Sequence, residues 1–131
     1  MASSSAPPSQ AKFTVVQFEF ATDYPDKVNL YMAPHYTHML THTESNGGKI
    51  VLIGPLLNSQ REEVAAAATG GLSIWRDATE EEITKYIETD PFVVHGLVKK
   101  WTVRPLLAMG GHKAFEDDFY RMPSGTDLSS P

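Results

Sequence analysis

Short apolar segments and helix-like segments alternate along this chain in an order that few folds share. The segments typical of strands are rich in aromatic and β-branched residues, and turn residues such as Gly, Pro and Asn separate them. Strands are expected at residues 13–20, 49–53, 72–75 and 98–106, and helices at about 34–45 and 79–87. This β-α-β-β-α-β order predicts an α+β fold of the ferredoxin-like type, with two helices on one face of an antiparallel sheet.

Turn and capping signals indicate where these elements begin and end. Pro34 suits the first turn of one helix, and Thr79 with Glu82 forms a capping-box pattern at the start of the other. Asp90-Pro91 predicts a further short helical turn that runs to about residue 95. We interpret Gly54-Pro55 as a turn that ends the second strand.

The chain has 131 residues, which is about the length of one domain. All the expected strands and helices fall within residues 13–106, which we therefore expect to fold as one domain. Residues 1–12 contain four Ser and two Pro, and they predict a disordered tail because they have little apolar surface to bury. Residues 107–131 are expected to form an extension with roughly the last ten residues disordered, and residues 58–71 either a helical turn or a loop.

Composition excludes several classes of function. The chain lacks Cys, which excludes disulfides, thiolate metal sites and a Cys nucleophile. Its formal net charge of −5 argues against a nucleic-acid partner. No apolar run approaches the roughly 20 residues that a membrane span needs, so no membrane partner is expected. The first residues lack the apolar core of a secretory signal, and the expected location is the cytoplasm.

Both faces of the expected sheet carry apolar side chains. In the first strand, Phe13 and Val15 fall on one face, while three further apolar residues fall on the other. Since the two helices cover only one face, something else must cover the second. We expect a homodimer formed through this open sheet face, and cover by residues 115–120 is the alternative.

Three histidines, His35, His38 and His42, lie within roughly 60° of arc on one face of the first helix. Because the outer two are about 10 Å apart along the helix axis, one metal ion could bind only two neighbours. A third ligand would have to come from another element, and the candidates are His95, Asp90 and Glu19. A His-ligated, metal-dependent enzyme is therefore the less favoured alternative, and we expect no metal.

Three features that occur in order along the chain resemble the YCII-related family. They are His35-Tyr-Thr-His38-Met-Leu in the first helix, Gly54-Pro55 after the second strand, and Asp90-Pro91-Phe92 with Gly96-Leu97 before the last strand. The resemblance covers about residues 13–106, and it implies a dimeric α+β barrel. One position departs from the family pattern, because His35 stands where the family has Arg, a permanently charged residue suited to binding anions.

The resemblance implies that His38 is the catalytic acid–base residue and that Asp90 orients it. It also implies a substrate pocket, whose candidate residues are His35, Tyr36, Gly54, Pro55 and Phe92. A His can take or give a proton near neutral pH, and a carboxylate on its second nitrogen fixes the tautomer and stabilises the imidazolium. Asp before Pro is also typical of a helix N-cap, a role that Asp90 could combine with the first.

No nucleophile is evident in an elbow-like motif, so proton transfer, elimination or isomerisation fits better than acyl transfer. The predicted function is that of a lyase- or isomerase-like enzyme that needs no cofactor and acts on a small organic metabolite. A binding or accessory protein, which holds a metabolite without converting it, is the alternative from another class.

Overall fold

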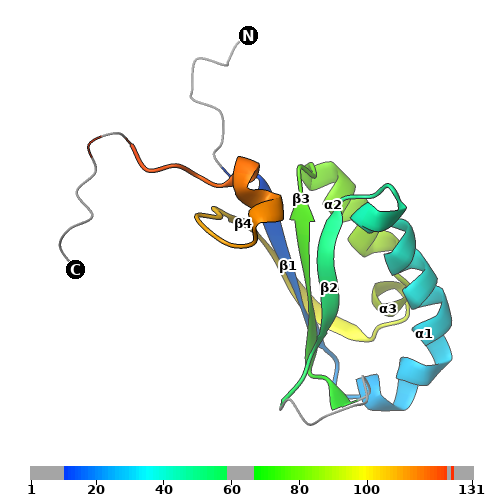
Figure 1. Ribbon diagram of the computed structural model, residues 1–131. Coiled ribbons are helices and arrows are strands. Elements are labelled where there is room, and N and C mark those ends of the chain that lie inside the picture. Colours follow the sequence, from blue (N-terminus) through cyan, green and yellow to red (C-terminus); the bar gives the residue numbers. More distant parts are fainter. Residues whose placement is uncertain (1–10, 59–66, 124, 126–131) are drawn as a thin grey trace.

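The computed structural model describes residues 11–58, 67–123 and 125 (Figure 1). The strands are β1 (Phe13–Phe20), β2 (Ile50–Leu56), β3 (Gly70–Arg76) and β4 (Val98–Leu106). The α-helices are α1 (Tyr24–Thr41), α2 (Glu80–Thr89) and α3 (Pro91–Val94), and the short 3-10 helices are η1 (Glu44–Asn46) and η3 (Lys113–Asp118). None of the helices in the described part of the chain combines the length and the apolar character of a membrane span.

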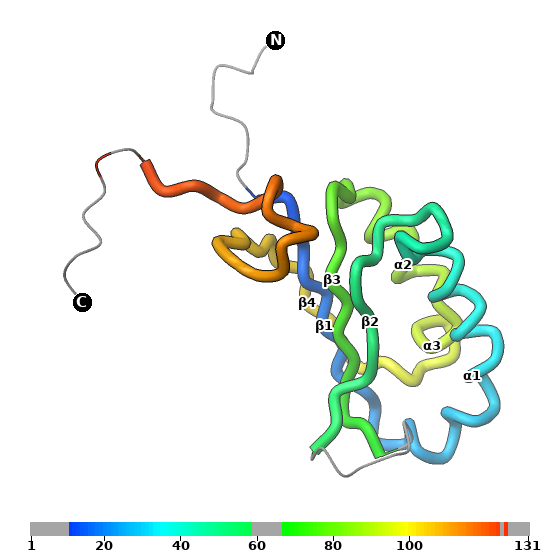
Figure 2. Tube along the Cα trace, viewed as in Figure 1, coloured from blue at the N-terminus to red at the C-terminus, as the bar shows by residue number. Residues whose placement is uncertain are grey.

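The four strands form one antiparallel sheet in the order β2-β3-β1-β4. Val16 of β1 lies opposite Ser73 of β3 and Val103 of β4, and this register decides which side chains share a face. The α-helices all lie on one side of the sheet, as Figures 1 and 2 show. The predicted ferredoxin-like α+β fold is therefore confirmed.

The first helix is longer than the sequence predicted. It begins at Tyr24, with Pro25 in its first turn, and Pro34 lies inside it instead of at its start. Pro34 cannot donate a hydrogen bond to the helix, but the turns before it are held by packing, since Tyr24 and Val28 are buried. Tertiary packing has outweighed the local preference of a Pro for a helix start.

The second strand also continues past its predicted end. Gly54 and Pro55 do not form a turn but pair with Leu72 and Gly71 of β3. β2 is an edge strand with β3 as its single neighbouring strand in the sheet. The N–H that Pro55 lacks is therefore not needed to bond a strand on the other side. Gly70 begins β3, whereas residues 59–66 of the segment interpreted as a turn or loop lie outside the described residues.

The elements after residue 78 agree closely with the sequence. The Thr79 hydroxyl accepts a hydrogen bond from the Glu82 amide at 3.0 Å, and the Glu82 carboxylate accepts one from the Thr79 amide at 2.8 Å. The capping box is thus confirmed, and so are the short helix after Asp90 and the last strand over 98–106. Most of the predicted tails, residues 1–10 and 126–131, lie outside the described residues.

The sheet face opposite the helices is covered only at one end among the described residues. There the ring of Phe115 in η3 packs edge-on against Phe13, with 5.9 Å between the centroids, and Arg76 lies 5.0 Å from the centre of the Phe115 ring. Figure 1 shows η3 on this side of the sheet. The remaining face carries exposed or half-buried apolar side chains, including Val15, Leu52, Leu72 and Ile74. Its polar side chains are Gln17 and Glu19 of β1 and Lys100, Thr102 and Arg104 of β4.

Candidate functional site

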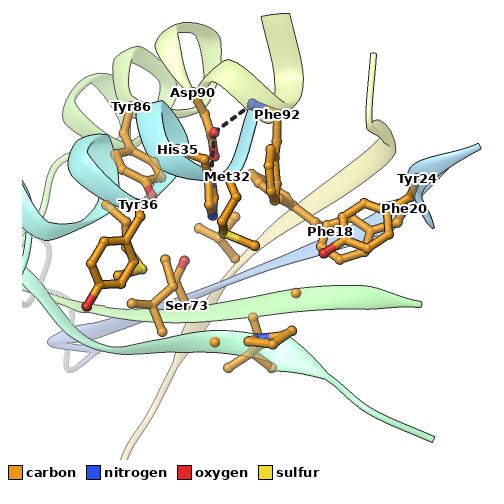
Figure 3. A pocket seen from close by; sticks show the side chains of 17 residues that line it. Phe18, Phe20, Tyr24, Met32, His35, Tyr36, Ser73, Tyr86, Asp90 and Phe92 are labelled. Carbon is orange, nitrogen blue, oxygen red and sulfur yellow. Dashed lines mark hydrogen bonds and ion pairs between the residues drawn. The ribbon is translucent and has the colours of Figure 1, made fainter. Parts of the chain in front are cut away.

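A pocket of about 260 Å³ lies between the helices and the sheet (Figure 3). It forms where the two clusters of the core meet: Val16 and Tyr86 belong to one cluster, and Tyr24 and Phe92 to the other. Most of its wall is apolar or aromatic. The polar side chains in the described part of the wall are His35, Asp90, Ser73 and the hydroxyls of Tyr24, Tyr36 and Tyr86.

Asp90 is a fully buried polar group in this wall, and its two carboxylate oxygens differ in their contacts, since Oδ2 has no hydrogen-bond partner among the described residues. Its side chain is fully buried, and its Oδ1 accepts a hydrogen bond from the Phe92 amide at 2.9 Å, which caps α3. The same oxygen lies 2.8 Å from Nδ1 of His35 on α1. Since an ionised carboxylate can only accept, the proton of that bond belongs to Nδ1. The His35 ring also stacks flat on Phe92, with centroids 3.7 Å apart and planes 1° apart.

The predicted pairing of His38 with Asp90 is wrong, because Asp90 binds His35. His38 instead places its Nε2 at 2.9 Å from the carbonyl oxygen of Tyr86 and stacks on the Tyr86 ring. The contacts show that α1 and α2 run antiparallel. One turn forward on α1, about 4.5 Å from residue 35 to residue 38, therefore corresponds to one turn back from Asp90, which directly follows α2, to Tyr86 within α2.

The structure gathers the other predicted site residues. His35, Tyr36, Gly54, Pro55 and Phe92 all line the pocket, whereas His38 is not among its described lining residues. Gly54 and Pro55 reach the pocket because β2 continues through them. Their roles in substrate binding stay predictions. Val28, Met32, His35 and Met39 are spaced so that they face inward from one side of α1. This spacing could have favoured His35 over His38, but it is visible only once the helix is known to begin at residue 24.

The candidate metal ligands do not come together in the described part of the chain. No group of three or more His, Asp or Glu residues there is arranged to hold an ion. The proposed third ligands have other neighbours, since His95 stacks on Tyr31 at 4.0 Å and Glu19 pairs with Lys99 and Lys100. The donor set of the described residues therefore does not fit a His-ligated metal site.

The His35–Asp90 pair is suited to proton transfer. With the proton on Nδ1, the neutral His35 ring leaves Nε2 as an acceptor, and no described residue hydrogen-bonds to Nε2. In Figure 3 a ring nitrogen of His35 points from the helices toward the sheet and into the pocket. Asp90 would stabilise the imidazolium that forms when Nε2 takes a proton.

Comparison with known proteins supports the fold of this chain but identifies no family for it. No protein-family model and no curated protein matches the chain. Among solved structures, 5-chloro-2-hydroxyhydroquinone dehydrochlorinase (TftG) from Burkholderia phenoliruptrix AC1100, in complex with 2,5-dihydroxybenzoquinone, matches with a TM-score of 0.64 at 19% identity, over 73% of this chain and 94% of that chain. A candidate antibiotic biosynthesis monooxygenase from Nitrosomonas europaea gives a TM-score of 0.44 at 13% identity, over 80% and 100% of the two chains. The match to the TftG structure agrees with the ferredoxin-like α+β fold described above.

The two neighbouring histidines should differ in tautomer when both are neutral. His35 donates to a carboxylate through Nδ1, whereas His38 donates to a carbonyl through Nε2, so their protons should sit on different nitrogens. Two-bond ¹⁵N–¹H correlation spectra of the imidazole rings distinguish these forms directly. His38 is the internal control, and a spectrum in which His35 carries its proton on Nε2 would contradict the His35–Asp90 pair.

Proposed function

We propose that this protein is a cofactor-independent enzyme in which His35 is the general acid–base residue and Asp90 orients it. The observation that carries the proposal is the 2.8 Å bond between His35 Nδ1 and a fully buried Asp90 carboxylate in the wall of a pocket. Both partners are held from other directions, His35 by stacking on Phe92 and Asp90 by capping α3. Such positioning is what acid–base catalysis requires of a proton carrier.

The proposed reaction is lyase- or isomerase-like. Proton removal, followed by loss of a leaving group or return of the proton elsewhere, needs a base that can become an acid, and His35 can serve as both. The TftG enzyme named above is a dehydrochlorinase, which supports elimination chemistry on this fold without fixing the reaction here. A pocket of about 260 Å³ with mainly apolar walls suits a small organic substrate.

The resemblance to the YCII-related family supports the same site with one change. Gly54-Pro55 and Phe92, which carry the resemblance, line the pocket beside Asp90. The histidine that meets the family's Asp position is His35, so we transfer the acid–base role from His38 to His35. We further propose that residues 13–106, which contain every strand and α-helix of the described chain, form the functional domain.

The proposal is tested by screening hydroxylated and chlorinated aromatic compounds, 5-chloro-2-hydroxyhydroquinone among them, for chloride release, isomerisation or hydrogen exchange in D₂O. For a compound that is converted, His35→Ala should lower kcat/KM by about 10²–10⁴-fold, the usual contribution of a positioned acid–base group. His38→Ala is the matched control, since it removes a histidine one turn away that does not line the pocket.

Two outcomes would contradict the catalytic proposal. If His38→Ala abolished turnover while His35→Ala did not, the acid–base residue would be His38. If compounds bound to the pocket with no conversion and no exchange, the protein would be the non-catalytic binding protein that is the alternative.

We also propose that the protein acts as a homodimer through its open sheet face. Val15, Leu72 and Ile74 are half-buried there, and Leu52 is 64% exposed. Exposed apolar patches of this kind indicate an interface, and a twofold contact would let each copy cover the other. The docked η3 covers only the end near Phe13, so it leaves this patch uncovered in the described chain.

A charge placed on the open face should break the dimer. Leu52→Glu should convert the dimer to a monomer in sedimentation equilibrium, because the new carboxylate would lose its water in the interface. Leu30→Glu is the matched control, since Leu30 is 71% exposed on α1, away from the sheet. A monomeric wild-type protein, or equal effects of the two substitutions, would contradict the proposal.

A further inference from the structure

The hydroxyl of Tyr86 is a buried polar group that has no hydrogen-bond partner in the described chain. Tyr86 lines the pocket, and in Figure 3 its hydroxyl points from α2 toward the sheet. Burial, with the nearby charge of Asp90 adding to it, raises the pKa of Tyr86 well above that of free tyrosine. The hydroxyl therefore keeps its proton at physiological pH, and it can donate a hydrogen bond to a bound molecule.

Ser73 provides a second hydroxyl from the opposite side of the pocket. Its Oγ accepts a hydrogen bond from Nε1 of Trp75 at 2.9 Å, so its own hydrogen is available to another acceptor. No described residue accepts that hydrogen. In Figure 3 the Ser73 oxygen points from the sheet toward the helices.

Trp75 holds these two hydroxyl residues near each other. Its indole binds Ser73, and its ring also packs edge-on against the Tyr86 ring, with 5.1 Å between the centroids. Two donors thus face the same pocket as the acceptor nitrogen of His35. Tyr86 shares the buried stripe of α2 with Ile83 and Ile87, and nothing in this local pattern distinguishes it from a core residue.

We propose that Ser73 and Tyr86 form a donor pair that binds the substrate oxygen on which negative charge develops when His35 takes a proton. This role of the donor pair rests on the proposed function of His35. It identifies the substrate class as small uncharged molecules with an enolisable carbonyl or a phenolic hydroxyl. The buried Asp90 carboxylate would repel a substrate that already carried a negative charge.

The proposed step transfers one proton from the substrate to His35. A proton leaves a C–H bond beside a carbonyl, or a phenolic O–H bond, and binds Nε2 of His35. The electron pair of the broken bond remains on the substrate as an enolate or a phenolate. Its oxygen accepts hydrogen bonds from the two hydroxyls, while Asp90 stabilises the imidazolium. Among the described residues that line the pocket there is no Lys or Arg, so apart from the protonated His35 the donors available to this oxygen are neutral.

The test compares two probes of similar shape, 4-nitrophenol and 4-nitroanisole, of which only the first can ionise. The full-length wild-type protein should bind 4-nitrophenol with an increase in nitrophenolate absorbance at a pH below the pKa of the free compound. Tyr86→Phe should weaken binding of the nitrophenolate about 10- to 100-fold, the usual effect of losing a hydrogen bond to a charged group. It should leave 4-nitroanisole binding unchanged, and Ser73→Ala should show the same selective loss.

Tyr31→Phe is the matched control, because this tyrosine stacks on His95 and does not line the pocket. Equal loss of both probes in Tyr86→Phe would show that Tyr86 only packs the wall, and it would overturn the inference. So would wild-type protein that binds 4-nitrophenol without forming nitrophenolate, or that binds neither probe. The proposed function is judged separately, by the effect of His35→Ala on turnover.

Discussion

The bonds made by one buried carboxylate determine how the helices and the site fit together. Asp90 Oδ1 accepts from the Phe92 amide and from His35, so the residue both begins α3 and fixes a side chain of α1. Burying a carboxylate is costly unless hydrogen bonds compensate. These two bonds come from different elements and both satisfy Oδ1, while Oδ2 is buried with no hydrogen-bond partner among the described residues. The contacts to Oδ1, which offset part of the cost of burial, therefore also orient the proposed catalytic histidine.

The antiparallel packing of α1 and α2 decides which histidine enters the pocket. His35 meets Asp90 at one level, and His38 meets the Tyr86 carbonyl one turn away. The pocket lies at the first level, between α1 and the sheet face that carries Ser73. The site thus depends on which side of α1 faces inward and on the register of the sheet. The first brings His35, and the second brings Ser73, to the same apolar pocket.

The sequence predicted the fold well and the site in part. The alternation of elements, the capping box of α2 and the Asp90 cap are local patterns, and the structure confirms them. The start of α1 was missed because packing of Tyr24 and Val28 outweighed the local signal of Pro34. The end of β2 was missed because pairing along an edge strand outweighed the turn signal of Pro55. Which histidine binds Asp90 depends on how two helices align, and no single-sequence pattern reports that alignment.

In the proposed mechanism His35 and Asp90 act as one catalytic unit. Their joint action is tested most directly by a double-mutant cycle in kcat/KM, with His35→Ala, Asp90→Asn and the double variant assayed on a compound that the wild-type protein converts. The double variant should be about as slow as His35→Ala alone, since residues that act as a unit have non-additive effects. Losses that multiply in the double variant would show that the two residues act independently, and would contradict a shared catalytic role.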